Sequence, residues 1–176
     1  MASESAVGAG ELGAALASAR SSYHDDANQG LPHFAATHLI LPLVLLGEFD
    51  EAVEQAMVMR QGWERAGRPP AGWMAPSFYA AALVHRVRGD EDEYARWQEL
   101  GRSIAMVTPS SCGIYFECRA ALHSGAVEQA RSLATMEAHI PSSHDPYAQA
   151  VRVETAVLAQ SDDAEEHLAS AQPLVR

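Results

Sequence analysis

The chain has 176 residues, of which 48% are hydrophobic and 20% are charged, and its formal net charge is −11. This balance predicts one globular domain with its own core, and it argues against a chain that is disordered as a whole. The negative charge argues against direct binding of nucleic acids or anionic membranes, because both present phosphate groups that need a surplus of cations. The two cysteines, Cys112 and Cys118, form neither a redox Cys-x-x-Cys motif nor a zinc pattern, and we expect reduced, partly buried thiols.

Targeting and membrane-spanning segments are not predicted. The N-terminus has no positively charged region, and the most apolar run, 39–46, is eight residues long with Pro42 inside it. A secretory signal needs a positively charged region at its start, and a membrane span needs a longer apolar run. We therefore expect a cytoplasmic protein.

Apolar residues recur at helical spacing after a small, polar stretch at 1–10, which we expect to be flexible. The predicted helices, in chain order, cover 11–23, 32–46, 50–66, 78–88, 91–106, 113–124, 127–139, 146–160 and 162–176. No segment alternates apolar and polar residues, so no strand is predicted. The fold class is therefore all-α, with about eight or nine helices in a single domain over 11–176.

Prolines and short polar residues mark several helix ends. The helix at 32–46 is apolar on nearly every side and should be central, and Pro42 within it should cause a kink or a break, since proline removes one backbone donor. Ser77 is the expected N-cap of the helix at 78–88. Asp90 with Glu93 predicts a capping box for the next helix.

A helix-ending phrase recurs along the chain at near-constant spacing. Gly47, Gly89, Gly125 and Ser161 each end one predicted helix before the next begins, at intervals of 42, 36 and 36 residues. A fixed period between about 20 and 50 residues is typical of stacked supersecondary units that cannot bury their apolar faces alone. The short turns predict that the helices pair as antiparallel hairpins.

The spacing of small residues resembles the tetratricopeptide repeat (TPR) over roughly 31–176. In that family a glycine closes the first helix of each unit, and an alanine follows five positions later where the helices pack closely. Two units match and two depart from this pattern: Gly47–Ala52 and Gly125–Ala130, against Gly89–Tyr94 and Ser161–Glu166. The resemblance implies antiparallel helix hairpins stacked as a TPR-like right-handed solenoid.

A second resemblance is carried by the run from Gly62 to Trp73 and by Tyr79 to His85. These segments are similar to the helical-repeat region of large actinobacterial ATP-binding regulators of the LuxR type, which lies between an NTPase and a DNA-binding helix-turn-helix. The chain contains no lysine and therefore no Gly-x-x-x-x-Gly-Lys phosphate loop. This resemblance implies only the sensing or docking module of such a regulator.

No catalytic, metal or cofactor site is predicted. None of the eight histidines forms His-Glu-x-x-His, and solvated loop histidines are the favoured interpretation of both His24 and the group of His139, His144 and Asp145. The acidic clusters at 90–93 and 162–166 lie at helix starts, where they complement the helix dipole.

Tyr79 and Tyr115 lie 36 residues apart, which in the TPR register places both on the concave face together with Arg86 and Arg119. Two tyrosines and two arginines in a groove suit an extended peptide, or an acidic or aromatic ligand. The alternative is that the tyrosines belong to the core and the arginines pair with carboxylates.

Trp73 lies in the longest break between helices and has two alternative roles. It forms either a lid over the groove or an anchor against Trp63, and we favour the anchor because large apolar side chains are usually buried. The leading functional hypothesis is a non-catalytic module that binds a protein segment in its concave groove. The alternative is a small-molecule sensor with an apolar pocket between helices. A homodimer is a further expectation, since the last predicted helix has an unfilled neighbour.

Overall fold

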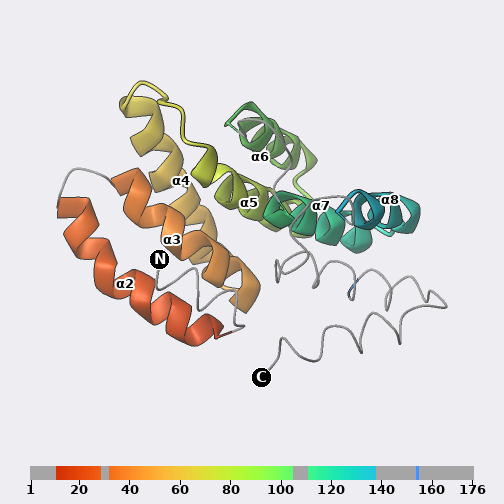
Figure 1. Ribbon diagram of the computed structural model, residues 1–176, viewed down its shortest axis with the longest axis horizontal. Coiled ribbons are helices and arrows are strands. Elements are labelled where there is room, and N and C mark those ends of the chain that lie inside the picture. Colours follow the sequence, from red (N-terminus) through yellow and green to blue (C-terminus); the bar gives the residue numbers. More distant parts are fainter. Residues whose placement is uncertain (1–10, 29–31, 105–110, 138–153, 155–176) are drawn as a thin grey trace.

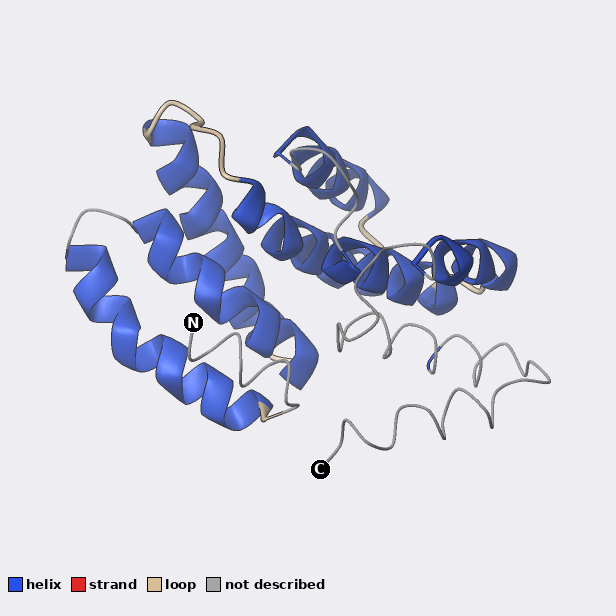
Figure 2. Cartoon of the chain, in the orientation of Figure 1, coloured by secondary structure: helices blue, strands red, loops and turns tan. Residues whose placement is uncertain are grey.

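The computed structural model describes residues 11–28, 32–104, 111–137 and 154 (Figure 1). All regular structure in these ranges is helical, and no strand occurs in them (Figure 2). The helices there are α2 (Leu12–Asn28), α3 (Pro32–Leu46), α4 (Phe49–Arg65), η1 (Gly72–Met74, a 3-10 helix), α5 (Ala75–Val87), α6 (Glu91–Ile104), α7 (Ser111–His123) and α8 (Val127–Glu137). The all-α prediction is confirmed. The predicted flexible stretch at 1–10, the helices at 146–160 and 162–176, and Ser161 lie outside the described residues.

The recurring glycines end α3, α5 and α7 in one backbone conformation. Gly47, Gly89 and Gly125 have φ angles of 81°, 75° and 75°, in the left-handed region that glycine adopts without steric cost. At the first of them, the glycine amide donates to the carbonyl of Val44 at 3.2 Å, and the next amide donates to the carbonyl of Leu43 at 2.9 Å. This pair of bonds is a Schellman motif, and the other two glycines repeat it.

The helices pack as successive pairs, α3 with α4, α5 with α6, and α7 with α8, while α2 covers α3. The first helices of the pairs also contact one another in series, α3 with α5 and α5 with α7. In Figure 1, α5 accordingly lies between α2–α4 on one side and α6–α8 on the other. Every residue of α5 from Ser77 to Val84 is buried, because neighbouring helices cover it on most sides.

An aromatic chain links three helices through the core. The ring of Phe78 on α5 lies 5.7 Å, centroid to centroid, from both Trp63 on α4 and Trp97 on α6. Phe78 and Trp97 are completely buried, and Trp63 is 5% exposed. These rings fix how the first two hairpins meet, because aromatic side chains bury more area than any others.

The structure contradicts the predicted cap at Ser77 and decides between two alternatives at Pro42. Ser77 does not cap α5, because η1 leads directly into that helix and Pro76 fits its first turn. The hydroxyl of Ser77 instead donates to the carbonyl of Thr37 on α3 at 3.2 Å. Of the two alternatives predicted at Pro42, a kink or a break, the break does not occur: α3 is one continuous helix from Pro32 to Leu46, packed against α2, α4 and α5, and the kink stays a prediction.

The other predicted helix signals have mixed outcomes. Half of the capping box forms, since the amide of Glu93 donates to Oδ1 of Asp90 at 3.2 Å. The carboxylate of Glu93 accepts instead from the indole nitrogen of Trp97 at 3.2 Å. α2 extends through Asn28, into residues predicted as a loop. α3 contacts α2, α4 and α5, as its apolar surface predicts.

Candidate functional site

A pocket of about 490 Å³ lies where the C-terminal ends of α3, α5 and α7 meet. Its wall is mainly apolar and comes from the three helices and the start of α4: Val44, Leu45, Phe49, Leu83, Val87 and Leu122. Leu46, at the rim, is 43% exposed, so the pocket opens to the surface. The glycine turn at Gly47 shapes one edge by ending α3 and reversing the chain into α4.

One ion pair lies on the wall of this pocket. The Nε atom of Arg119 is 3.0 Å from Oε1 of Glu154, and both residues line the pocket. The guanidinium also lies over the ring of Tyr115, 5.1 Å from its centroid. The ring and the carboxylate together fix the guanidinium, so the polar group of the wall is positioned in advance and nearly neutral.

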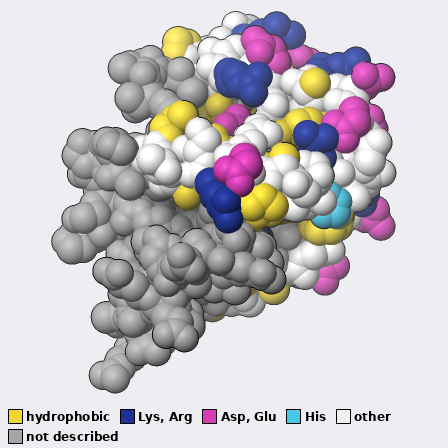
Figure 3. All heavy atoms as spheres, turned by 90° about the vertical axis from the view of Figure 1, so that its right-hand side faces the viewer, with side chains coloured by type: hydrophobic (Ala, Val, Ile, Leu, Met, Phe, Trp, Pro, Cys, Tyr) yellow, Lys and Arg dark blue, Asp and Glu magenta, His cyan; other side chains and the backbone are white. Residues whose placement is uncertain are grey.

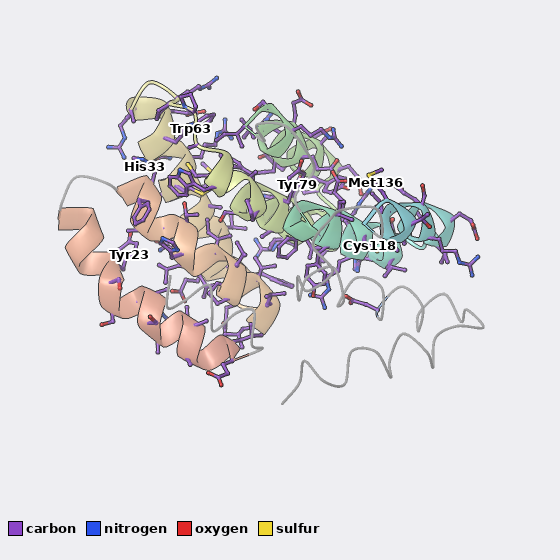
Figure 4. All side chains as sticks on the ribbon, viewed as in Figure 1. Tyr23, His33, Trp63, Tyr79, Cys118 and Met136 are labelled. Atoms are coloured by element: carbon purple, nitrogen blue, oxygen red, sulfur yellow. The ribbon has the colours of Figure 1, made fainter. Side chains whose placement is uncertain are left out.

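The two predicted groove tyrosines lie in the core, the alternative that the sequence left open. Tyr115 is 7% exposed and Tyr79 is 6% exposed. The ring of Tyr115 packs against the guanidinium of Arg119. The ring of Tyr79 packs on α6, and a Cβ added to Gly101 would lie 3.1 Å from it. Figure 4 shows Tyr79 on α5 where α6 and α7 come near.

Arg86 also faces α6 and not the pocket. Its guanidinium carbon lies 4.1 Å from the centroid of the Tyr94 ring, and it forms an ion pair with Glu91. The structure thus brings Tyr79 and Arg86 together with α6, and Tyr115 and Arg119 together with the pocket wall. Arg119 is the predicted groove residue whose side chain lines the pocket. That the four side chains share one groove stays a prediction.

A polar network connects α6 with α7 beside Tyr79. The side-chain amide of Gln98 donates to the hydroxyl of Tyr94 at 2.7 Å, and Arg102 donates to the amide oxygen of Gln98 at 3.1 Å. Arg102 also lies 3.7 Å from the carboxylate of Glu117 on α7. Burial raises the pKa of Glu117, although Arg102 opposes that effect. The i,i+4 spacing of Tyr94, Gln98 and Arg102 is the sequence signal for this network. The network itself was not predicted.

Trp73 packs against Phe34 and not against Trp63. The Phe34 and Trp73 ring centroids are 5.3 Å apart in an edge-to-face arrangement, and Trp73 is 47% exposed. The loop is anchored instead by Trp63, whose indole nitrogen donates to the carbonyl of Pro69 at 2.9 Å. Met74, next to Trp73, is completely buried.

The described part of the chain was searched for groups of metal-ligating side chains and for membrane-spanning helices. It contains no group of three or more His, Cys, Asp or Glu side chains that could hold a metal ion. His139, His144 and Asp145 lie outside it. None of its helices is long and apolar enough to cross a membrane. On the described part of the face in Figure 3, arginine and acidic side chains are interspersed, with apolar groups between them. Cys118 is buried, with its Sγ atom 3.7 Å from the carbonyl of Ala130.

The chain matches no protein-family model, no curated protein and no solved structure. Its function is therefore inferred from the chemistry of its own surfaces.

Proposed function

We propose that this protein is a non-catalytic docking module that binds a segment of a partner protein in the pocket at the ends of α3, α5 and α7. The observation that carries the proposal is the pocket itself. It is mainly apolar, it opens to the surface, and three successive hairpins contribute to it. Among the described residues that line it, Arg119 and Glu154 already form an ion pair, so neither of these two charges must be neutralised when an apolar side chain enters.

The proposal includes a TPR-like solenoid, in which first helices stack along a concave face. Its support is the serial contact of α3, α5 and α7. Further support comes from Ala52 and Ala130, the two alanines that match the repeat pattern, since both are completely buried. Concave faces of such stacks are extended binding surfaces. The second resemblance adds the proposal that the module serves a bacterial regulatory system.

The apolar wall determines the kind of segment that fits. Burying one leucine or phenylalanine side chain in such a pocket contributes about 1.5–3 kcal/mol. The fixed Arg119–Glu154 pair offers donors and acceptors to the backbone of the bound segment. A segment with one or two large apolar residues therefore suits the pocket best.

A second candidate is a small-molecule sensor that uses the same pocket. The pocket volume of about 490 Å³ favours it, because small-molecule sites commonly measure about 300–1,000 Å³. Native mass spectrometry of the purified chain separates the two candidates. A retained mass of a few hundred daltons favours the sensor, and a bare chain favours docking.

The docking proposal is tested with a displayed library of random dodecapeptides, selected on the full chain. We expect enriched peptides with large apolar residues whose Kd rises about ten-fold or more in Leu46→Asp. Met136→Asp on α8 is the matched control, because Met136 is 47% exposed and Leu46 is 43% exposed. Circular dichroism checks that both variants keep their helicity. If no enriched peptide distinguishes the two variants, the pocket is not a docking site.

A further inference from the structure

An exposed aromatic surface lies at the other end of the α3/α4 hairpin from the pocket. It consists of Phe34 and His38 on α3 and Trp73 on η1. Phe34 is 38% exposed and Trp73 is 47% exposed, and their rings meet edge to face. The ring of His38 packs on Phe34 at a centroid distance of 4.9 Å. Adjacent large aromatic side chains left in solvent mark an interaction site more often than isolated ones do.

The exposure of Trp73 does not result from a loose loop. Beyond the end of α4, six residues after Trp63, the carbonyl of Pro69 accepts a hydrogen bond from the buried indole of Trp63. On the other side of Trp73, Met74 is completely buried and donates its amide to the carbonyl of Ala71 at 2.8 Å. The backbone on both sides therefore holds the indole in a fixed position at the surface, as a preorganised contact requires.

The last turns of α4 add positive charge at the same end of the hairpin. Arg65 and Arg68 lie there with Glu64, which accepts from Arg68 at 3.0 Å and from Arg60 at 3.2 Å. The guanidinium carbon of Arg60 lies 5.7 Å from the Trp97 ring centroid, on the side of α6. Arg65 and Arg68 are exposed. In a chain of net charge −11, this turn is thus locally positive.

Close helix packing brings together the end of α4, which carries the arginines, and the start of α3, which carries Phe34. A Cβ placed on Gly62 would lie 3.0 Å from Cβ of His33, so the last turns of α4 pack directly against the start of α3. Figure 4 shows His33 and Trp63 at this shared end. Arg68 has a φ of 55°, a left-handed conformation that is uncommon for a residue with a side chain. In that conformation its guanidinium carbon lies 5.7 Å from the Trp63 ring centroid.

We propose that this aromatic–arginine surface, Phe34, His38, Trp73, Arg65 and Arg68, is a second docking site. Its occupant is an acidic segment of a partner protein that presents one large apolar side chain. Charge complementarity selects the carboxylates, which arginine binds in a two-pronged geometry. The Phe34–Trp73 wall receives the apolar side chain, and tryptophan and arginine are the residue types that most often dominate binding energy at interfaces.

The two surfaces are far enough apart to act independently. Phe34 and Leu46 lie near opposite ends of α3, and at 1.5 Å per residue the separation along the helix is about 18 Å. A substitution at one surface should therefore leave binding at the other unchanged.

The test uses dodecapeptides selected on the full chain and measures Kd by fluorescence anisotropy. We expect one enriched class with net negative charge and at least one aromatic or leucine residue. For this class, Trp73→Ala raises Kd about ten-fold or more, and Leu46→Asp leaves it unchanged. The double variant Arg65→Gln/Arg68→Gln weakens binding and flattens its dependence on salt.

Two matched controls account for general effects of exposed substitutions. Met136→Ala removes a side chain of the same 47% exposure as Trp73. Arg96→Gln removes an arginine whose side chain is 58% exposed, against 61% for Arg68. Neither control should change Kd for the acidic class, and circular dichroism confirms that every variant is folded.

Three results overturn the inference. The selected peptides carry no net negative charge, or the acidic class binds Trp73→Ala as well as the original chain, or Leu46→Asp removes all peptide binding. The last result leaves the pocket as the docking site and so spares the proposed function. Competition by a single-stranded oligonucleotide, with no acidic peptide selected, also overturns the inference in favour of a phosphate-binding surface.

Discussion

The hairpins α3/α4 and α5/α6 reverse at the same kind of glycine turn but pack differently beyond it. Five residues after the turn glycine, the first hairpin has Ala52, which is completely buried, and the second has Tyr94, which is partly exposed. In the second hairpin the buried large side chain is Trp97, three residues later. The glycine turn thus fixes where a hairpin reverses, whereas the side chains of its second helix decide what fills the space between helices.

The two hairpins also differ in which atoms make the close contact between their helices. In the first hairpin, Gly62 faces the backbone and Cβ of His33. In the second, Gly101 faces the ring of Tyr79. Backbone atoms are held by a whole helix, whereas a ring moves by rotating about its own side-chain bonds, so the first contact is the more rigid.

The largest expected loss of stability comes from giving each hairpin the residue type of the other at Ala52 and Tyr94. Ala52→Tyr inserts a ring where no space exists, and we expect the free energy of unfolding to fall by about 3 kcal/mol or more. Tyr94→Ala loses the bond to Gln98 and the stacking of Arg86, at a smaller cost of about 1–2 kcal/mol. Urea unfolding followed by circular dichroism measures both. Equal losses would mean that the two hairpins share one packing.

Alanine at the two close-contact glycines should have an intermediate and unequal effect. A helical alanine gains about 1 kcal/mol over glycine. At Gly62 the contact with His33 outweighs that gain, and we expect a net loss of about 1 kcal/mol. At Gly101 the Tyr79 ring shifts, and the change stays within about 0.5 kcal/mol. Thermal unfolding compares the variants, and a Gly101→Ala loss as large as that of Gly62→Ala would contradict the difference in rigidity.

The smallest effect concerns the polar side of α6 and depends on pH. Burial raises the pKa of Glu117 above its value in the unfolded chain, so the native state binds more protons between those two pKa values. Ionisation of Glu117 therefore lowers stability as pH rises through that window. Glu117→Gln should raise the free energy of unfolding near neutral pH. The gain should shrink as pH falls through that window and should be gone below the ordinary glutamate pKa of about 4.3.

A matched control for this effect is Glu99→Gln. Glu99 lies 3.8 Å from the same Arg102, but its side chain is 75% exposed. Its replacement should change stability by less than about 0.5 kcal/mol at any pH. Urea unfolding across a pH series measures both variants. A gain for Glu117→Gln that does not depend on pH would show that ionisation is not its cause.

Helix positions were predictable from the chain because their signals are local. The glycines at 47, 89 and 125 end helices through their own backbone freedom, and the structure has all three in the left-handed region. The effects of Pro42 and Ser77 could not be predicted from the chain, for the opposite reason. Their effect depends on whether neighbouring helices hold the chain, and α3 and α5 are both held on several sides.

The candidate site was much less predictable. The repeat spacing relates Tyr79 to Tyr115, which lie in equivalent positions of successive units. The spacing does not show which side of each helix a neighbouring helix covers. Tyr79 is covered by α6 at Gly101, and Tyr115 lies beneath Arg119. The pocket combines ends of helices from three hairpins with Glu154, so no continuous segment of the sequence contains it.

The sequence by itself determined the helical class, the places where the hairpins reverse and the negative net charge. Each of these follows from residue type, local spacing or summed charge. Only the tertiary structure decided that both groove tyrosines are buried, that Trp73 lies exposed beside Phe34, and that the pocket forms at the ends of α3, α5 and α7. Burial and exposure depend on which helix covers which face, and that choice is made by contacts between residues far apart in the chain.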